Sequence, residues 1–135
     1  MTNDQAFNRA ASLCARSEQC SAHILAKLEE WETPNPDAVL RQLQAEHYID
    51  DARYARAFAH DKLRYNLWGR LKIRAALRMK GVDNRAIDEA LGDLGNDEYL
   101  EILNKVLTKK RRELQRRETD AYRLSQKLAR HAASH

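Results

Sequence analysis

Helix-breaking residues are scarce in this chain of 135 residues, which has two prolines and four glycines. Residues that favour strands are scarce too, with three valines, five isoleucines and four threonines. Long, unbranched side chains of high helix propensity fill most of the remaining positions. This composition predicts an all-α protein. The length suits one ordinary domain or two to three miniature ones.

Cysteines and apolar runs are also few. Two cysteines cannot build a disulfide scaffold, and free thiols are the rule in the reducing cytosol. No apolar run approaches the roughly 18 residues that a membrane span needs. The polar segment 1–9 lacks the apolar centre of a secretion signal. We therefore expect a cytoplasmic protein with no membrane contact.

Catalytic and cofactor-binding motifs are missing from the sequence. No glycine-rich phosphate loop is followed by a lysine, and no Gly-x-Gly-x-x-Gly precedes a helix. Asp50 and Asp51 are adjacent, so on a helix they diverge by about 100° and do not form an acid–base pair. Helix capping explains both carboxylates. We expect no enzymatic activity and no cofactor.

A metal site is weakly indicated at one place. Cys20 and His23 are spaced i, i+3 and can share a metal, with Cys14 as a third ligand. A structural zinc normally needs four ligands. We therefore interpret Cys20 as a buried thiol and His23 as a surface residue. The other histidines are scattered and suggest no site: His47, His60, His131 and His135.

Acidic residues are unevenly distributed. Residues 1–46 have four basic and seven acidic side chains, whereas residues 62–80 have seven basic ones and no acidic one. Residues 105–130 have ten basic side chains against three acidic ones. This gradient indicates a surface for a polyanion in the second half of the chain. The alternative is a solvated, charged helix face.

An internal repeat organises the apolar residues. The i, i+4 pair Ile24/Leu28 recurs 49 residues later as Ile73/Leu77, and again 51 residues later as Leu124/Leu128. Val39/Leu43 recurs as Ile87/Leu91, 48 residues later. A fixed period of this size is typical of repeat architectures. We predict three tandem helical units at 1–48, 49–95 and 96–135.

The first unit should contain three helices. The first spans about 4–15, and the second begins after an N-cap at Ser17, with Cys20 on its apolar face. The third spans about 37–46, capped by Asn35 with Pro36 in the first helical position.

The second unit should also contain three helices. It begins at Asp50, breaks near residues 66–67, and continues as a helix over 68–80. Gly81 falls where a left-handed residue ends a helix. Asp83 or Asn84 caps the last helix, which Gly95 stops.

The third unit has fewer residues that mark helix ends, because residues 96–135 contain neither Gly nor Pro. The repeat predicts two helices there with a break near residues 118–119. The competing interpretation is one long helix in a coiled coil, with heptad positions from Leu100 to Leu128. That heptad places Lys110 and Arg117 in its core, which weakens it.

The strongest candidate binding surface lies in residues 62–80. Lysine and arginine neutralise phosphates or acidic protein surface, and aromatic rings supply stacking or anchor area. Arg70, Arg74 and Arg78 are spaced to form one ridge while Ile73 and Leu77 face inward. The alternative is that Tyr65 and Trp68 pack a joint between units. The candidate set is Lys62, Arg64, Tyr65, Trp68, Arg70, Lys72, Arg74, Arg78 and Lys80.

A second basic patch follows in the third unit. It surrounds the helix, which suits phosphate attraction better than shaped recognition, and comprises Lys109, Lys110, Arg111, Arg112, Arg116 and Arg117. Trp31 and Tyr48 are expected in the core or at joints between units.

Two sequence elements resemble those of the RecX family, which regulates the RecA recombinase. They are Tyr48-Ile49-Asp50-Asp51-x-Arg53-Tyr54-Ala55 and Gly69-Arg70-x-Lys72-Ile73 with Leu77 and Lys80-Gly81. The resemblance covers roughly residues 5–131 and is strongest over 43–91. His47 departs from it, because the family often has Gly at this position.

The resemblance implies three three-helix units in an elongated, curved array. It also implies docking in the groove of the RecA–DNA filament. From the charge distribution we expect the concave, basic side of the second and third units to face RecA. RecA ATPase, strand exchange and repressor cleavage in the SOS response would be inhibited. The third unit stops after two helices, so the last helix is expected to be missing.

Two other functions remain open. One is a sequence-independent protein that binds single- or double-stranded DNA and affects recombination indirectly. The other is a dimeric helical adaptor that pairs through the leucines between residues 100 and 128. We expect a monomer.

Overall fold

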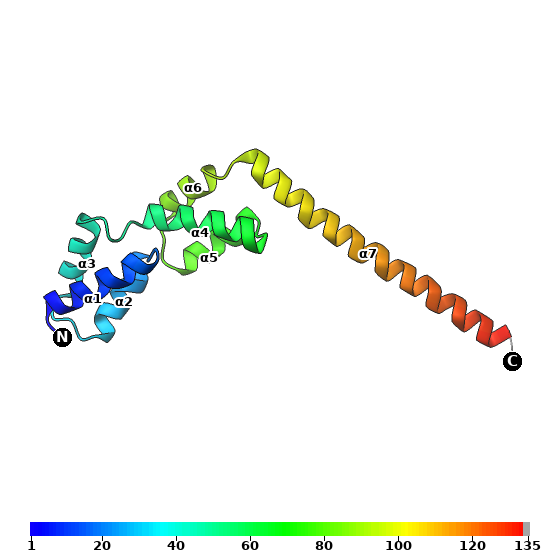
Figure 1. The fold of residues 1–135 in the computed structure, drawn as a ribbon, viewed down its shortest axis with the longest axis horizontal. Coiled ribbons are helices and arrows are strands. Elements are labelled where there is room, and N and C mark those ends of the chain that lie inside the picture. Colours follow the sequence, from blue (N-terminus) through cyan, green and yellow to red (C-terminus); the bar gives the residue numbers. More distant parts are fainter. Residues whose placement is uncertain (134–135) are drawn as a thin grey trace. The chain divides into compact units, whose positions relative to one another are not determined.

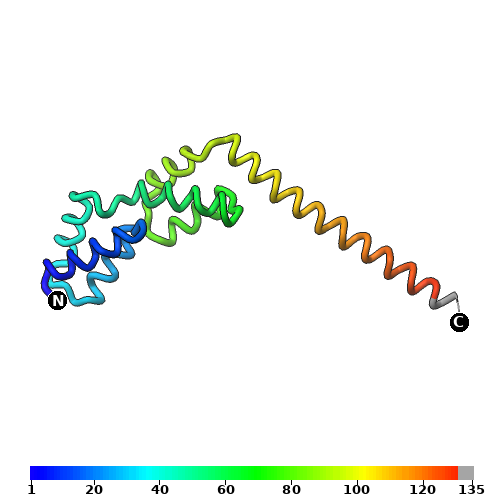
Figure 2. Tube along the Cα trace, viewed as in Figure 1, coloured from blue at the N-terminus to red at the C-terminus, as the bar shows by residue number. Residues whose placement is uncertain are grey.

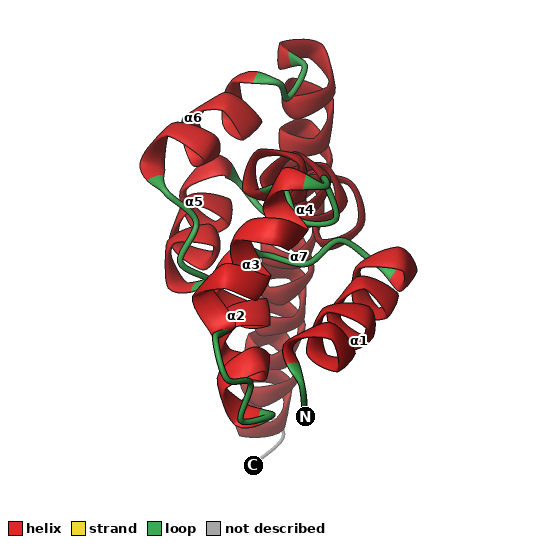
Figure 3. Ribbon diagram, turned by 90° about the vertical axis from the view of Figure 1, so that its left-hand side faces the viewer, coloured by secondary structure: helices red, strands yellow, loops and turns green. Residues whose placement is uncertain are grey.

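The computed structural model describes residues 1–133, with side chains to residue 130, and over that range it contains helices and no strand (Figures 1 and 3). The predicted all-α class is therefore confirmed. The predictions for His131 and His135 fall outside the described side chains. The helices are α1 (Asn3–Arg16), α2 (Ser21–Glu30), α3 (Pro36–Ala45), α4 (Asp51–Asn66), α5 (Arg70–Met79), α6 (Asn84–Gly92) and α7 (Asn96–Ala133).

The chain forms two compact units, Met1–Asn96 and Asp97–His135. The first unit contains α1 to α6. In it α1 packs against α2 and α3, and α4 packs against α5 and α6. The trace in Figure 2 shows these two sets of three helices as successive segments of the chain.

The helices of the first unit begin at side-chain caps that the sequence largely predicts. Asn35 accepts from the Ala38 N–H, Asp50 from the Arg53 N–H and Asp83 from the Ala86 N–H. Pro36 occupies the first turn of α3, as expected. These predictions are confirmed. The physical reason is that each cap satisfies an N–H group of the first turn that the helix itself leaves unpaired.

The predicted cap at Ser17 is wrong. Ser17 ends α1, where its backbone N–H donates to the Leu13 carbonyl. Helix α2 begins at Ser21, after Cys20, whose side chain makes no capping hydrogen bond. The acceptor comes from the next repeat, since the Asp51 carboxylate accepts from the Ser21 N–H at 2.8 Å. Sequence-local capping rules do not foresee this tertiary cap.

Three helices end in the same turn. Glu32, His47 and Gly81 follow α2, α3 and α5 with φ values of 54°, 63° and 78°. The two N–H groups after each cap bond back to carbonyls of the last turn, which defines the Schellman motif. The left-handed role predicted for Gly81 is confirmed. The predicted break at residues 66–67 is also confirmed, because Leu67 ends α4 with φ 57°.

The inward residues repeat between the two sets of helices. Ile24 and Leu28 of α2 are fully buried, as are their counterparts Ile73 and Leu77 of α5, and small residues line α1 and α4 against them. This repetition explains the sequence period. The hydrophobic core of the first set contains Ala6, Ala10, Ile24, Leu28, Val39, Leu43 and Ile49; the buried residues of the second set include Ala55, Ala59, Leu63, Ile73, Leu77, Ile87 and Ala90.

Of the two residues expected in the core or at joints, Trp31 lies against the first core, whereas Tyr48 is exposed. Trp31 packs partly buried against this core, with the Arg9 guanidinium 4.3 Å from its ring centre. Tyr48 is more exposed and meets Phe7 edge-on at 5.7 Å.

Helix α7 is continuous over 38 residues, so the predicted break near residues 118–119 is wrong. The competing interpretation, one long helix, is the one observed. The physical reason is local, since no Gly or Pro interrupts a run of strong helix formers. The bounds 1–48, 49–95 and 96–135 stay predictions, although the last segment holds one helix up to residue 133.

Candidate partner-binding surface

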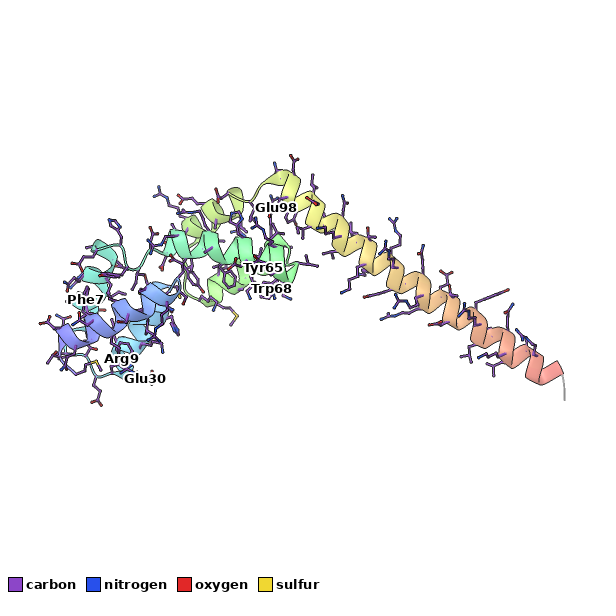
Figure 4. All side chains as sticks on the ribbon, viewed as in Figure 1. Phe7, Arg9, Glu30, Tyr65, Trp68 and Glu98 are labelled. Atoms are coloured by element: carbon purple, nitrogen blue, oxygen red, sulfur yellow. The ribbon has the colours of Figure 1, made fainter. Side chains whose placement is uncertain are left out.

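The basic segment 62–80 covers the end of α4 and all of α5, and its cations lie on two different faces. One face carries lysines over aromatic rings. The other carries arginines that contact α6. Figure 4 labels Tyr65 and Trp68, which lie near each other where α4 gives way to α5.

Three aromatic rings form a ladder along the first face. Tyr54 and Phe58 stack with ring centres 6.0 Å apart, and Phe58 meets Trp68 at 6.3 Å with the planes at 67°. Trp68 is half-buried and Tyr65, beyond the ladder, is 76% exposed. Trp68 therefore both packs against α4 and presents part of its ring to solvent.

Lysines surround this ladder. The Lys62 ammonium lies 4.9 Å from the Trp68 ring centre and the Lys72 ammonium 4.5 Å, while Lys80 approaches Phe58 at 5.7 Å. Such cation–π contacts hold flexible lysines over one surface. The lysine–aromatic face (Lys62, Trp68, Lys72, Lys80 and Phe58) thus combines positive charge with anchor area for an acidic partner.

The predicted arginine ridge forms on α5, but its side chains turn toward α6 and the first residue of α7. Arg74 pairs with Asp88 at 2.7 Å, Arg78 donates to Asn84 and Arg70 donates to Asn96. Ile73 and Leu77 face inward as predicted. These contacts, with α6 for Arg74 and Arg78 and with the first residue of α7 for Arg70, give the arginines a role in the fold, and their partner-binding role stays a prediction. Arg64 lies exposed on the last turn of α4.

The second patch lies entirely on α7. All six of its basic side chains are exposed, and they are distributed around the helix as the sequence indicated. The same helix exposes large apolar residues: Leu100, Leu103, Leu107, Leu114, Tyr122, Leu124 and Leu128.

The motif that carries the family resemblance joins the two repeats. Arg53 pairs through its Nε with Glu18 at 2.6 Å, and its Nη2 donates to the carbonyls of His47 and Tyr48. Asp51, as described above, caps α2. The Asp-Asp-x-Arg element is therefore a structural joint between the two repeats.

A hollow of about 490 Å³ opens at this joint, lined by Glu18, Gln19, Cys20, Ala22, His23, Tyr54, Met79, Lys80 and Gly81. Burial, with Cys20 and Asp51 nearby, raises the pKa of Tyr54 above its ordinary value of 10.0. Burial and Glu18 likewise raise the pKa of Cys14, which Arg53 partly offsets. The tyrosine and the thiol therefore stay protonated at neutral pH.

The two residues of the weakly indicated metal site differ in their exposure to solvent. Cys20 is buried and His23 exposed, as we interpreted them. Within that range no three His, Cys, Asp or Glu side chains are grouped to hold a metal ion. No helix in the described chain is long and apolar enough to cross a membrane.

Sequence reasoning missed several surface residues. Phe58 is absent from the candidate set, yet the ammonium groups of Lys62 and Lys80 lie over its ring. Leu71 and Met79 of α5 are exposed and were not singled out. Their helical spacing predicts this exposure, since both lie opposite the buried Ile73 and Leu77 on the helix.

These features define an all-α protein in which two sets of three helices follow one another, with a cationic surface that carries aromatic rings on the set α4–α6. A family model described as the second three-helix domain of RecX matches residues 50–91. Regulatory protein RecX of Clostridium acetobutylicum is 32% identical over 128 residues, which cover 92% of this chain and 59% of the relative. A regulatory protein RecX of Thermus thermophilus is 33% identical over 102 residues, which cover 75% of this chain and 70% of the relative.

A crystal structure of a regulatory protein RecX is also similar, with a TM-score of 0.75 and 27% identity over 84% of this chain and 57% of that one. The chain belongs to the RecX family. It spans 59%, 50% and 44% of the length of three relatives, from Clostridium acetobutylicum, Clostridium beijerinckii and Geobacillus kaustophilus.

Proposed function

We propose that this protein is a regulator that binds the RecA–DNA filament and inhibits RecA ATPase, strand exchange and co-protease activity. The observation that carries the proposal is the coincidence of two features in one segment. Residues 50–91 match the family model, and the same segment holds the lysine–aromatic face. The resemblance supplies the partner, and the face supplies chemistry suited to an acidic protein surface or to phosphates.

The proposed mechanism is occupancy without catalysis. A bound molecule that spans neighbouring RecA protomers would resist the relative motions that ATP turnover requires. It would also block access of a second DNA or of a repressor. Helix α7, with 38 residues, is about 57 Å long at 1.5 Å per residue, which provides reach for such a contact.

Binding to preformed filaments tests this proposal. Filaments of RecA on single-stranded DNA are sedimented with increasing amounts of the protein, and the bound fraction is measured with excess naked DNA as competitor. We expect saturable cosedimentation that the competitor does not remove. Complete release by naked DNA would contradict the proposal.

A second candidate function is sequence-independent DNA binding, which the basic surface of α7 favours. Phosphate contacts release counterions, so the affinity should then fall steeply between low and physiological salt. A fluorescently labelled oligonucleotide titrated at several salt concentrations measures this slope. Affinity that is weak, or insensitive to salt, would exclude DNA as the main partner.

A dimeric adaptor is a third candidate, supported by the exposed leucines of α7. The helix carries ten basic residues against three acidic ones over 105–130, so two copies would repel each other. We therefore propose a monomer on its own in solution. The solution mass, measured by light scattering, distinguishes the two states.

A further inference from the structure

We propose that the outer ridge of α5, formed by Leu71, Ala75 and Met79, docks on a protein surface that is apolar and rimmed by carboxylates. These three residues are spaced i, i+4, i+8 and face away from Ile73 and Leu77. Leu71 is 85% exposed and Met79 is 90% exposed. Large apolar side chains aligned on an exposed face commonly mark an interaction site.

The first repeat provides an internal control for this ridge. Helix α2 shares the fold of α5 and has the equivalent inward pair, 49 residues earlier. Its outward residues at the positions of Leu71, Ala75 and Met79 are Ala22, Ala26 and Glu30, all exposed. The three-helix fold therefore does not require large apolar side chains at these positions. Their presence in the second repeat alone calls for a partner.

Charge on both sides of the ridge defines the partner further. Lys72 borders one side, where its ammonium lies over Trp68. Arg78 and Arg74 border the other side, where Arg78 donates to the neutral Asn84 and Arg74 is paired with Asp88. A partner with carboxylates around an apolar patch complements this arrangement. A second copy of the chain does not, because the same cations would meet across the interface.

Nucleic acid fits this face less well than protein does. Phosphates are neutralised by lysine and arginine, which here occupy the flanks. The side chains at the crest of the helix are aliphatic, and burying them gains free energy only against another apolar surface. Phosphate-lined DNA offers little such surface.

The ridge leads into the hollow at the joint between repeats. Met79 lines that hollow together with Lys80 and Tyr54. A partner side chain that follows the ridge therefore meets a recess of about 490 Å³ in which it can be anchored. The docking surface then extends from α5 onto the joint.

This inference rests on the proposed function, in which the protein partner is RecA. The variant Leu71→Gln/Met79→Gln removes the ridge while keeping residues of similar helix propensity. The matched control is Ala26→Gln/Glu30→Gln, which changes two of the equivalent positions on α2. Three quantities are measured for each protein: affinity for RecA filaments, affinity for naked single-stranded DNA, and the thermal unfolding temperature.

We expect the ridge variant to lose roughly tenfold or more in filament affinity. Its DNA affinity and unfolding temperature should stay unchanged, and the control should bind filaments like the wild type. Wild-type affinity in the ridge variant would overturn the docking surface and leave the proposed function standing. Parallel loss of DNA affinity would overturn the assignment to a protein partner. Failure of the wild type to bind filaments would overturn both proposals.

Discussion

The Asp51 carboxylate accepts a 2.8 Å hydrogen bond from the backbone N–H of Ser21, thirty residues earlier in the chain. One side chain thus begins a helix in the first repeat while lying in the first turn of α4 in the second. Two residues later, Arg53 forms an ion pair with Glu18, which is a second polar contact between the two repeats. The two repeats of the first unit are therefore joined by polar interactions, a helix cap and an ion pair.

Replacing Asp51 with alanine should lower the free energy of unfolding by about 1 kcal/mol, because α2 loses its N-terminal acceptor. Urea unfolding followed by circular dichroism measures this. Asp51→Asn keeps an acceptor oxygen and serves as the control, with a smaller loss expected. Equal losses in both variants would show that charge, not the capping bond, dominates at this position.

His47 is a second position where the structure yields a stability prediction. Its φ of 63° is left-handed, a conformation that costs most residues free energy but not glycine. His47→Gly should therefore stabilise the protein by up to about 1 kcal/mol. The measurement is again the unfolding free energy.

Gly81 provides the opposite control for the His47→Gly substitution. It has φ 78°, and an added Cβ would lie 3.0 Å from the Ala22 Cβ. Gly81→Ala should destabilise the protein. Loss of stability in His47→Gly would mean that the imidazole makes a favourable contact that outweighs the backbone strain.

The continuity of α7 is tested with proline. Thr119→Pro falls in the interior of the helix, where proline costs about 3 kcal/mol and breaks a hydrogen bond. We expect a clear loss of helical circular dichroism and faster amide hydrogen exchange around residue 119. A proline tolerated without loss of helicity would indicate that two helices meet there. Thr119→Ala, which favours the helix at the same position, is the matched control.

The sequence predicted most features that depend on local chemistry. Asn35, Asp50 and Asp83 cap helices because a side-chain oxygen near an unpaired N–H is sufficient. Gly81 adopts the left-handed turn because no side chain opposes it. The repeat was readable because each unit buries an i, i+4 apolar pair.

Several features that the sequence did not predict depend on contacts between residues far apart in the chain. Ser17 matches the local pattern of an N-cap, but the acceptor at the start of α2 is the Asp51 carboxylate of the next repeat. The arginine ridge was placed on the correct face of α5, yet Asp88 of α6 engages Arg74. The break in α7 was inferred from the period alone and had no Gly or Pro to produce it.

Charge reversal on the lysine–aromatic face should separate binding from folding. Lys62→Glu/Lys72→Glu removes both ammonium groups near Trp68, so filament affinity should drop at least roughly tenfold. Stability should change little, because both groups lie at the surface. Filament cosedimentation and thermal unfolding provide the two measurements.

Two further variants complete that comparison. Arg85→Glu reverses a largely exposed charge on α6 and should leave filament binding unchanged. Reversing Arg70 and Arg74 should also weaken binding, but loss of the pair with Asp88 would contribute through the fold. Unchanged filament affinity in the double lysine variant would contradict the assignment of this face.

The rate of ATP hydrolysis by RecA on single-stranded DNA is the primary test of the proposed regulation. The protein is titrated onto preformed filaments with naked DNA in excess, so competition for DNA cannot explain a loss of activity. We predict inhibition at well below one copy per RecA protomer. ATP hydrolysis that continues unchanged up to saturating protein would contradict the account.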